Sequence, residues 1–113
     1  MNGYDREEAL AYILRRIRRQ DHPELADRID GLIAQAIDAD LAFMRETGVI
    51  AEDGNAGDAW YEEDDAFEYI VETLAAANDL DPEQAVKMAS LIDDFMDGQQ
   101  RYLEYKGLVQ DEE

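Results

Sequence analysis

The chain has 113 residues, of which 46% are hydrophobic, and this length and composition predict a single globular domain with its own core. The absence of cysteine from this sequence excludes disulfide bonds, thiolate metal ligands and cysteine nucleophiles. The 29 acidic and 10 basic residues give a net charge of −19, which disfavours nucleic acids and anionic membranes as direct partners.

The charge is distributed unevenly along the chain. Residues 1–20 hold five arginines and three acids, whereas residues 21–113 hold five bases and 26 acids. The first residues lack the basic-then-apolar order of a signal peptide, and no apolar run approaches the roughly 20 residues of a membrane span. We therefore expect a soluble, cytoplasmic protein whose acidic surface attracts cations or a basic protein surface.

The first predicted helix covers residues 5–19. Its apolar residues repeat at the spacing of one helical face, and they are Leu10, Ile13, Leu14 and Ile17. Tyr12 and the arginines lie on the other side of this helix, where they could bind a phosphate or RNA. We expect more strongly that the arginines pair with acids elsewhere in the chain, including those of a neighbouring helix, because those acids are so numerous.

The second predicted helix covers residues 23–46, with Pro23 at its first position and Gly48 as a left-handed stop. One acid, Asp40, falls in the middle of its apolar stripe. A carboxylate there is expected to be buried and paired, because burying a bare charge is costly. Its candidate partners are Arg15, Arg18, Tyr102 and Tyr105. The alternatives are a titrating or metal-binding Asp40, or an earlier helix end that leaves it in solvent.

The second half of the chain begins with an acidic, glycine-containing loop at residues 48–58. A third helix is predicted at residues 59–77, for which Asp58 can serve as the N-cap. The fourth helix is predicted at residues 82–106, with Asp81 as its cap and Pro82 at its first position. Its apolar phase is kept after Gly98, so the helix should continue through this glycine. Residues 108–113 are expected to form a frayed acidic tail.

Four amphipathic helices joined by short turns and one longer loop indicate an all-α fold. The predicted architecture is a compact antiparallel four-helix bundle, with helices at about residues 5–19, 23–46, 59–77 and 82–106, in one domain that spans residues 1–113. A homodimer that pools the apolar faces of the helices is the alternative arrangement.

The third predicted helix carries a dense run of acids opposite its apolar residues, although like charges at i,i+3 and i,i+4 cost roughly 0.2–0.5 kcal/mol per pair. We interpret this face, with the outer face of the fourth helix, as a surface that docks on a basic protein, such as a nucleic-acid-binding protein, by imitating the charge spacing of a nucleic acid backbone. The residues of this predicted surface are Glu62, Asp65, Glu68, Glu72, Tyr61, Tyr69, Asp93, Asp97 and Glu104. The alternative is a structural or oligomerising bundle whose charge serves solubility only.

Two patterns raise the alternative of a metal binder or a divalent-cation-dependent enzyme. Residues 53–64 resemble a calcium loop in its first and third positions, but Gly57 and Asp58 replace an expected ligand and the turn glycine, and Asp64 replaces the bidentate glutamate. Five carboxylates resemble, in order and spacing, the E-E-x-x-E…E-x-x-D magnesium site of all-α nucleotide pyrophosphohydrolases; they are Asp64, Asp65, Glu68, Asp94 and Asp97. The last two fall on the outer side of the fourth predicted helix, which does not favour convergence with the others.

No other pattern indicates catalysis. The single histidine, His22, precedes Pro23 at a helix start, where a cap-region residue is more common than a general base. The sequence has neither a nucleophile elbow nor a phosphate-cradling glycine loop. We therefore expect a binding protein rather than an enzyme, with no catalytic residues, no metal and no cofactor.

Overall fold

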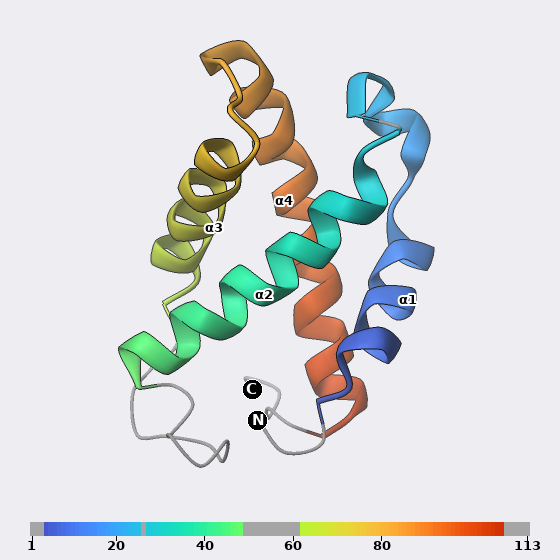
Figure 1. Cartoon of the computed structure of the whole chain (residues 1–113). Helices are drawn as coiled ribbons and strands as arrows, with labels where there is room; N and C mark the ends of the chain where they lie inside the picture. Colours follow the sequence, from blue (N-terminus) through green and yellow to red (C-terminus); the bar gives the residue numbers. More distant parts are fainter. Residues whose placement is uncertain (1–3, 26, 49–61, 108–113) are drawn as a thin grey trace.

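The computed structural model describes residues 4–25, 27–48 and 62–107. Within these ranges the chain forms four α-helices, and they are α1 (Arg6–Arg16), α2 (Ile29–Thr47), α3 (Glu63–Ala77) and α4 (Pro82–Tyr105). Successive helices run in opposite directions, and α2 lies obliquely across α4, with α1 and α3 on opposite sides (Figure 1). The predicted all-α antiparallel four-helix bundle is confirmed, and its radius of gyration of 13.8 Å is close to the value of about 13 Å for a compact chain of this length.

The connection between α1 and α2 differs from the prediction. Helix α1 ends at Arg16 rather than near residue 19, because Ile17 is extended, with ψ at 131°. Two short 3-10 helices follow, η1 (Arg19–Asp21) and η2 (Pro23–Leu25), and α2 begins only at Ile29. Pro23 therefore starts a 3-10 turn and not the second helix, and this turn places Leu25 in the core with 5% of its surface exposed.

The C-terminal end of α2 and the N-terminal end of α4 agree with the prediction. Gly48 follows α2 with φ at 86°, the left-handed conformation expected of a glycine stop. The side chain of Asp81 accepts a hydrogen bond from the backbone N–H of Gln84, whose side chain accepts one from the backbone N–H of Asp81. Helix α4 continues through Gly98, as expected. The predicted cap Asp58 and residues 59–61 of the predicted third helix lie outside the described residues. Glu62, which was predicted to be helical, is extended with ψ at 104°, and α3 begins at Glu63.

The core lies between the four helices. Its largest fully buried side chains come from every helix and include Ile13, Ile29, Ile33, Ile37, Ile70, Leu74, Met88, Phe95 and Tyr102. No helix within the described ranges is both long enough and apolar enough to cross a membrane.

Gly98 sets the distance between α1 and α4. A Cβ atom at this position would lie 3.1 Å from Cγ2 and 3.3 Å from Cγ1 of Ile13, which is fully buried in α1. These distances are shorter than ordinary contacts between carbon atoms, which lie near 3.5–4.0 Å. The glycine is therefore the residue that lets α1 pack directly on the backbone of α4.

We predict that alanine has different effects at the two helical glycines. Gly31 is exposed in α2 and no atom lies within 4 Å of an added Cβ, so Gly31→Ala should raise the free energy of unfolding by about 1 kcal/mol. At Gly98 the same gain in helix propensity is offset by the contact with Ile13, so Gly98→Ala should be neutral or destabilising. Urea denaturation of both variants measures the difference, and an equal gain at both positions would contradict the close approach.

Candidate interaction surface

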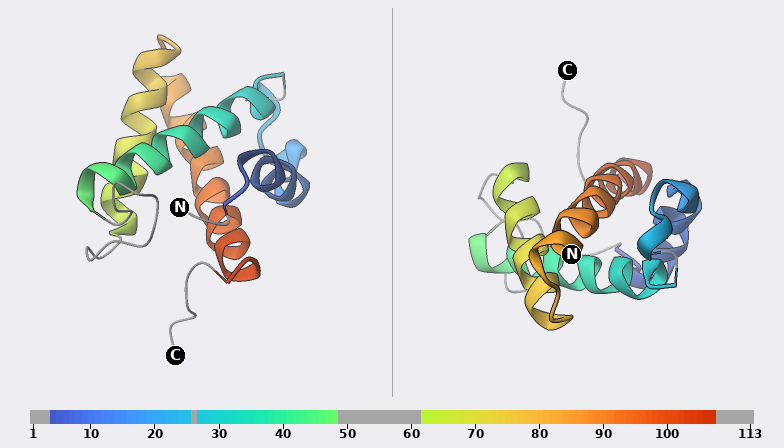
Figure 2. Two further views of the ribbon diagram at one scale, coloured as in Figure 1. Left: turned by 60° about the horizontal axis from the view of Figure 1, so that its bottom comes forward. Right: turned by 90° about the horizontal axis from the view of Figure 1, so that it is seen from above.

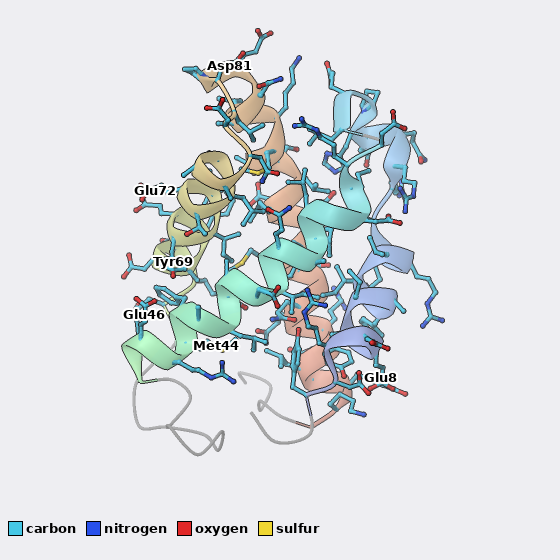
Figure 3. All side chains as sticks on the ribbon, in the orientation of Figure 1. Glu8, Met44, Glu46, Tyr69, Glu72 and Asp81 are labelled. Atoms are coloured by element: carbon cyan, nitrogen blue, oxygen red, sulfur yellow. The ribbon has the colours of Figure 1, made fainter. Side chains whose placement is uncertain are left out.

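The segment from residue 62 to residue 77 contains six acids and no base. All six side chains are exposed, and they are Glu62, Glu63, Asp64, Asp65, Glu68 and Glu72. At 100° per residue, four of them (Asp64, Asp65, Glu68 and Glu72) fall within about 100° of arc on α3. Figure 3 shows Glu72 directed away from the rest of the bundle. This exposed set of carboxylates is called the α3 acidic face below.

Apolar packing of the opposite side holds α3 in this orientation. Ala66, Ile70 and Leu74 are buried and repeat every four residues, and α3 packs against both α2 and α4. Rotation of the helix about its axis would expose these side chains to water, so the direction of the α3 acidic face is fixed by the core.

The ion pairs of the described residues lie elsewhere in the molecule. They join Arg6 to Asp38, Arg19 to Asp30, His22 to Asp94, Lys87 to Glu24 and Glu83, Arg101 to Asp97, and Lys106 to Glu8. None of these pairs involves a carboxylate of α3. Within the described ranges, the α3 acidic face is therefore not neutralised by a basic side chain of the same chain.

The arginines of the first helix do not offset the charge of α3. Arg15 and Arg16 belong to α1, which lies on the opposite side of the bundle from α3 in all three views (Figures 1 and 2). Helix α1 instead packs on α2 and α4. The fold thus separates the basic end of the first helix from the most acidic helix.

Tyr69 lies at the edge of the α3 acidic face beside α2. Its hydroxyl donates a hydrogen bond to Oε2 of Glu46 at 3.2 Å, and its ring packs on Phe43 with a centroid separation of 5.4 Å. Partial burial, together with the Glu46 carboxylate, raises the pKa of Tyr69. Figure 3 shows Tyr69 and Glu46 close together across the two helices. Tyr61, the other tyrosine of the predicted surface, lies outside the described residues.

The acids predicted on the outer face of α4 have a different environment. Asp93 is exposed, but Asp97 pairs with Arg101 at 3.3 Å, one helical turn away. Glu104 is half-buried and accepts a hydrogen bond from Nε2 of Gln100 at 3.0 Å. Two of the three carboxylates are thus already engaged, so the α3 acidic face is the stronger candidate for a partner of opposite charge.

Asp40 lies fully buried in α2 and belongs to a polar chain across the core. Nε2 of Gln99 donates a hydrogen bond to Oδ2 of Asp40 at 3.0 Å, and Oε1 of Gln99 accepts one from the hydroxyl of Tyr4 at 2.7 Å. Burial, with a smaller contribution from Asp40, raises the pKa of Tyr4 well above its usual value. Gln99 was not predicted as a partner of Asp40, although it is a polar side chain in phase with Phe95 and Tyr102 on α4.

His22 is buried, with 5% of its surface exposed, and its Nε2 lies 2.6 Å from Oδ2 of Asp94 on α4. This pair holds the α1–α2 connection against α4, a role that its position before Pro23 did not indicate. Asp94, one of the five carboxylates that resemble a pyrophosphohydrolase site, is thus engaged with a histidine. Among the described residues, no group of three or more histidine or acidic side chains is arranged to hold a metal ion. The calcium-like loop falls outside the described residues except for its last three positions, residues 62–64.

Comparisons with known proteins show no match. No family model, curated protein or solved structure is significantly similar to the chain.

We predict that Glu68→Lys stabilises the protein. The lysine would remove like-charge repulsion with Asp64, Asp65 and Glu72 and replace it by attraction, which should raise the free energy of unfolding by roughly 0.5–1 kcal/mol at low salt. The matched control is Asp38→Lys, which makes the same change in charge at an exposed site but replaces the two-point pair with Arg6 by repulsion and should be destabilising. Urea denaturation at low and high salt measures both effects, and a loss of stability in Glu68→Lys would show that α3 is neutralised.

We predict that the stability of the protein falls above pH 10 and falls less in Tyr4→Phe. Because the pKa of Tyr4 is raised in the folded protein, the unfolded chain releases this proton first, near pH 10, and alkaline pH favours unfolding. The decrease in the free energy of unfolding between pH 8 and pH 10.5 should therefore be smaller in the variant. Equal pH dependence in the two proteins would contradict burial of the Tyr4 hydroxyl.

Proposed function

We propose that this protein is a small acidic interaction module that docks through the α3 acidic face on a basic protein surface. The observation that supports this function is that the carboxylates of the α3 acidic face are exposed to solvent and are not paired with basic side chains. Six carboxylates between residues 62 and 72 are exposed, and none pairs with a base among the described residues. A basic partner would remove the like-charge repulsion along α3, so the charge that costs stability in the free protein would favour association.

The charge density of α3 is similar to that of a nucleic acid. At 1.5 Å of rise per residue, six carboxylates over eleven residues give about one charge per 3 Å of helix axis. This value lies between about 1.7 Å per charge for duplex DNA and about 3.4 Å for one of its strands. A protein groove that follows phosphates is therefore the kind of basic surface that fits best, which makes an inhibitor of a nucleic-acid-binding protein the specific form of the proposal.

Rigidity of α3 also supports docking. The carboxylates are carried by a helix whose apolar side is packed in the core, so little backbone freedom would be lost when the partner binds. Charges held in fixed relative positions also accelerate association by steering, an effect that decreases as salt is added.

The test is affinity capture from a nuclease-treated lysate, followed by measurement of the dissociation constant with the purified partner. The triple variant Asp65→Asn/Glu68→Gln/Glu72→Gln removes three charges from the α3 acidic face. It should weaken binding about tenfold or more, since each exposed charge contributes up to about 1 kcal/mol. Duplex DNA should compete with the wild-type protein for a partner whose basic surface binds nucleic acid.

The control makes the same change in net charge on the other side of the molecule. Glu7→Gln/Asp21→Asn/Asp27→Asn replaces three exposed acids outside α3, and it should leave the dissociation constant nearly unchanged. If both triple variants weaken binding equally, the partner responds to net charge and the α3 acidic face is not a docking site. Binding that is insensitive to salt would also contradict the proposal.

A further inference from the structure

An open cleft of about 430 Å³ is lined by residues of α1 and α4. Helix α1 lies on the side of the bundle away from α3 (Figure 1). The lining residues of the cleft are Glu8, Tyr12, Arg15, Arg16 and Tyr105. The volume is within the range of about 300–1,000 Å³ that is typical of small-molecule sites. Two of the five lining residues are arginines, although the chain has almost three acids for every base.

The charge of this cleft is locally positive. Arg15 and Arg16 have no carboxylate partner among the described residues. Nε of Arg15 donates to the backbone carbonyl of Ala11 at 3.4 Å, and the guanidinium carbon of Arg16 lies 5.8 Å from the centroid of the Tyr12 ring. The guanidinium groups thus remain available to an anion that enters from solvent.

Glu8, the one acid of the lining, is already engaged. Its Oε1 accepts hydrogen bonds from the hydroxyl of Tyr102 and from Nζ of Lys106, both at 2.9 Å. The hydrogen bond from Lys106 lowers the pKa of Glu8, so the carboxylate stays ionised and balances the lysine. The net charge of the cleft therefore comes from Arg15 and Arg16.

Two stacked tyrosines form the aromatic part of the cleft. The rings of Tyr12 and Tyr105 are stacked, with centroids 5.6 Å apart and an interplanar angle of 24°. Tyr12 is held from behind by the buried Tyr102, whose ring lies 5.5 Å away at 61°. Tyr105 keeps 67% of its surface exposed, which is unusual for a large ring and leaves area for a ligand to stack on.

We infer that this cleft binds a small aromatic anion of the class of nucleoside monophosphates. The phosphate would lie between Arg15 and Arg16, because guanidinium groups match phosphate oxygens in charge and geometry. The base would stack on Tyr105, an arrangement that accepts any base because each has a π face.

The negative net charge of the protein favours a small anionic ligand over a long one. The α3 acidic face is separated from α1 by about two interhelical spacings of 8–10 Å each, which is beyond the Debye length of about 8 Å at physiological salt. A mononucleotide that stays within the cleft is therefore largely screened from those acids. A polynucleotide would extend over the acidic remainder of the surface and be repelled.

The first test is calorimetric titration of the full chain with AMP, ribose 5-phosphate and adenosine. AMP should bind saturably with a stoichiometry of one. Ribose 5-phosphate and adenosine should each bind at least about tenfold more weakly than AMP, because each lacks one of the two recognised groups. Absence of AMP binding would overturn the inference. Equal affinity for AMP and ribose 5-phosphate would overturn it as well, because the cleft would then be a site for phosphate alone.

Variants then assign the binding to the cleft. Arg15→Gln/Arg16→Gln and Tyr105→Ala should each weaken AMP binding about tenfold or more, and both change exposed side chains that are not part of the core. The matched control Arg28→Gln/Arg45→Gln removes two exposed arginines outside the cleft and should leave the affinity unchanged. If the control variant weakens AMP binding as much as Arg15→Gln/Arg16→Gln does, the affinity depends only on the overall charge of the protein and the inference fails.

Discussion

Ten bases cannot neutralise 29 acids, so the fold decides where the excess negative charge lies. In the described part of the chain, lysines and arginines form ion pairs with acids of α1, α2, α4 and Glu24. Helix α3 receives none of these bases, although residues 62–72 hold six acids. Packing of the apolar side of α3 on α2 and α4 compensates the repulsion and keeps the carboxylates in solvent. The same partition leaves the arginines at the end of α1 beside a cleft and far from α3.

The rest of the bundle forms a rigid frame for these two surfaces. Gly98 allows α1 to pack directly on α4, and the polar chain of Tyr4, Gln99 and Asp40 joins the segment before α1 to α4 and α2. Buried polar groups must be satisfied, so this chain of hydrogen bonds fixes the relative positions of the elements that contribute to it. His22 and Asp94 extend the frame to the connection between α1 and α2.

The periodic features of the fold could be predicted from the sequence, and the pairwise contacts could not. Apolar spacing indicated four helices and the outward direction of Glu68 and Glu72, and the glycine and Asp-Pro signals gave the ends next to Gly48 and Asp81. The extended Ile17 was missed, because its side chain continues the apolar period although its backbone ends the helix. The partners of Asp40 and His22 depend on which helices are neighbours, and helical periodicity contains no information on packing order. The packing order of the helices also determines whether the acids of α3 lie close enough to basic side chains of the same chain to pair with them, so this could not be predicted either.

The distribution of charge over the surface is measured most directly by paramagnetic relaxation of the backbone amide protons. The relaxation enhancement caused by a cationic nitroxide in solution is divided, residue by residue, by the enhancement caused by a neutral nitroxide of the same size. Because unneutralised acids are concentrated on α3, this ratio should be highest at residues 62–72. The same ratio should be lowest at residues 15–19, which hold Arg15 and Arg16 at the end of α1 and Arg18 and Arg19 directly after it. A ratio that is uniform over the molecule, or highest on α2 or α4, would contradict this distribution of charge.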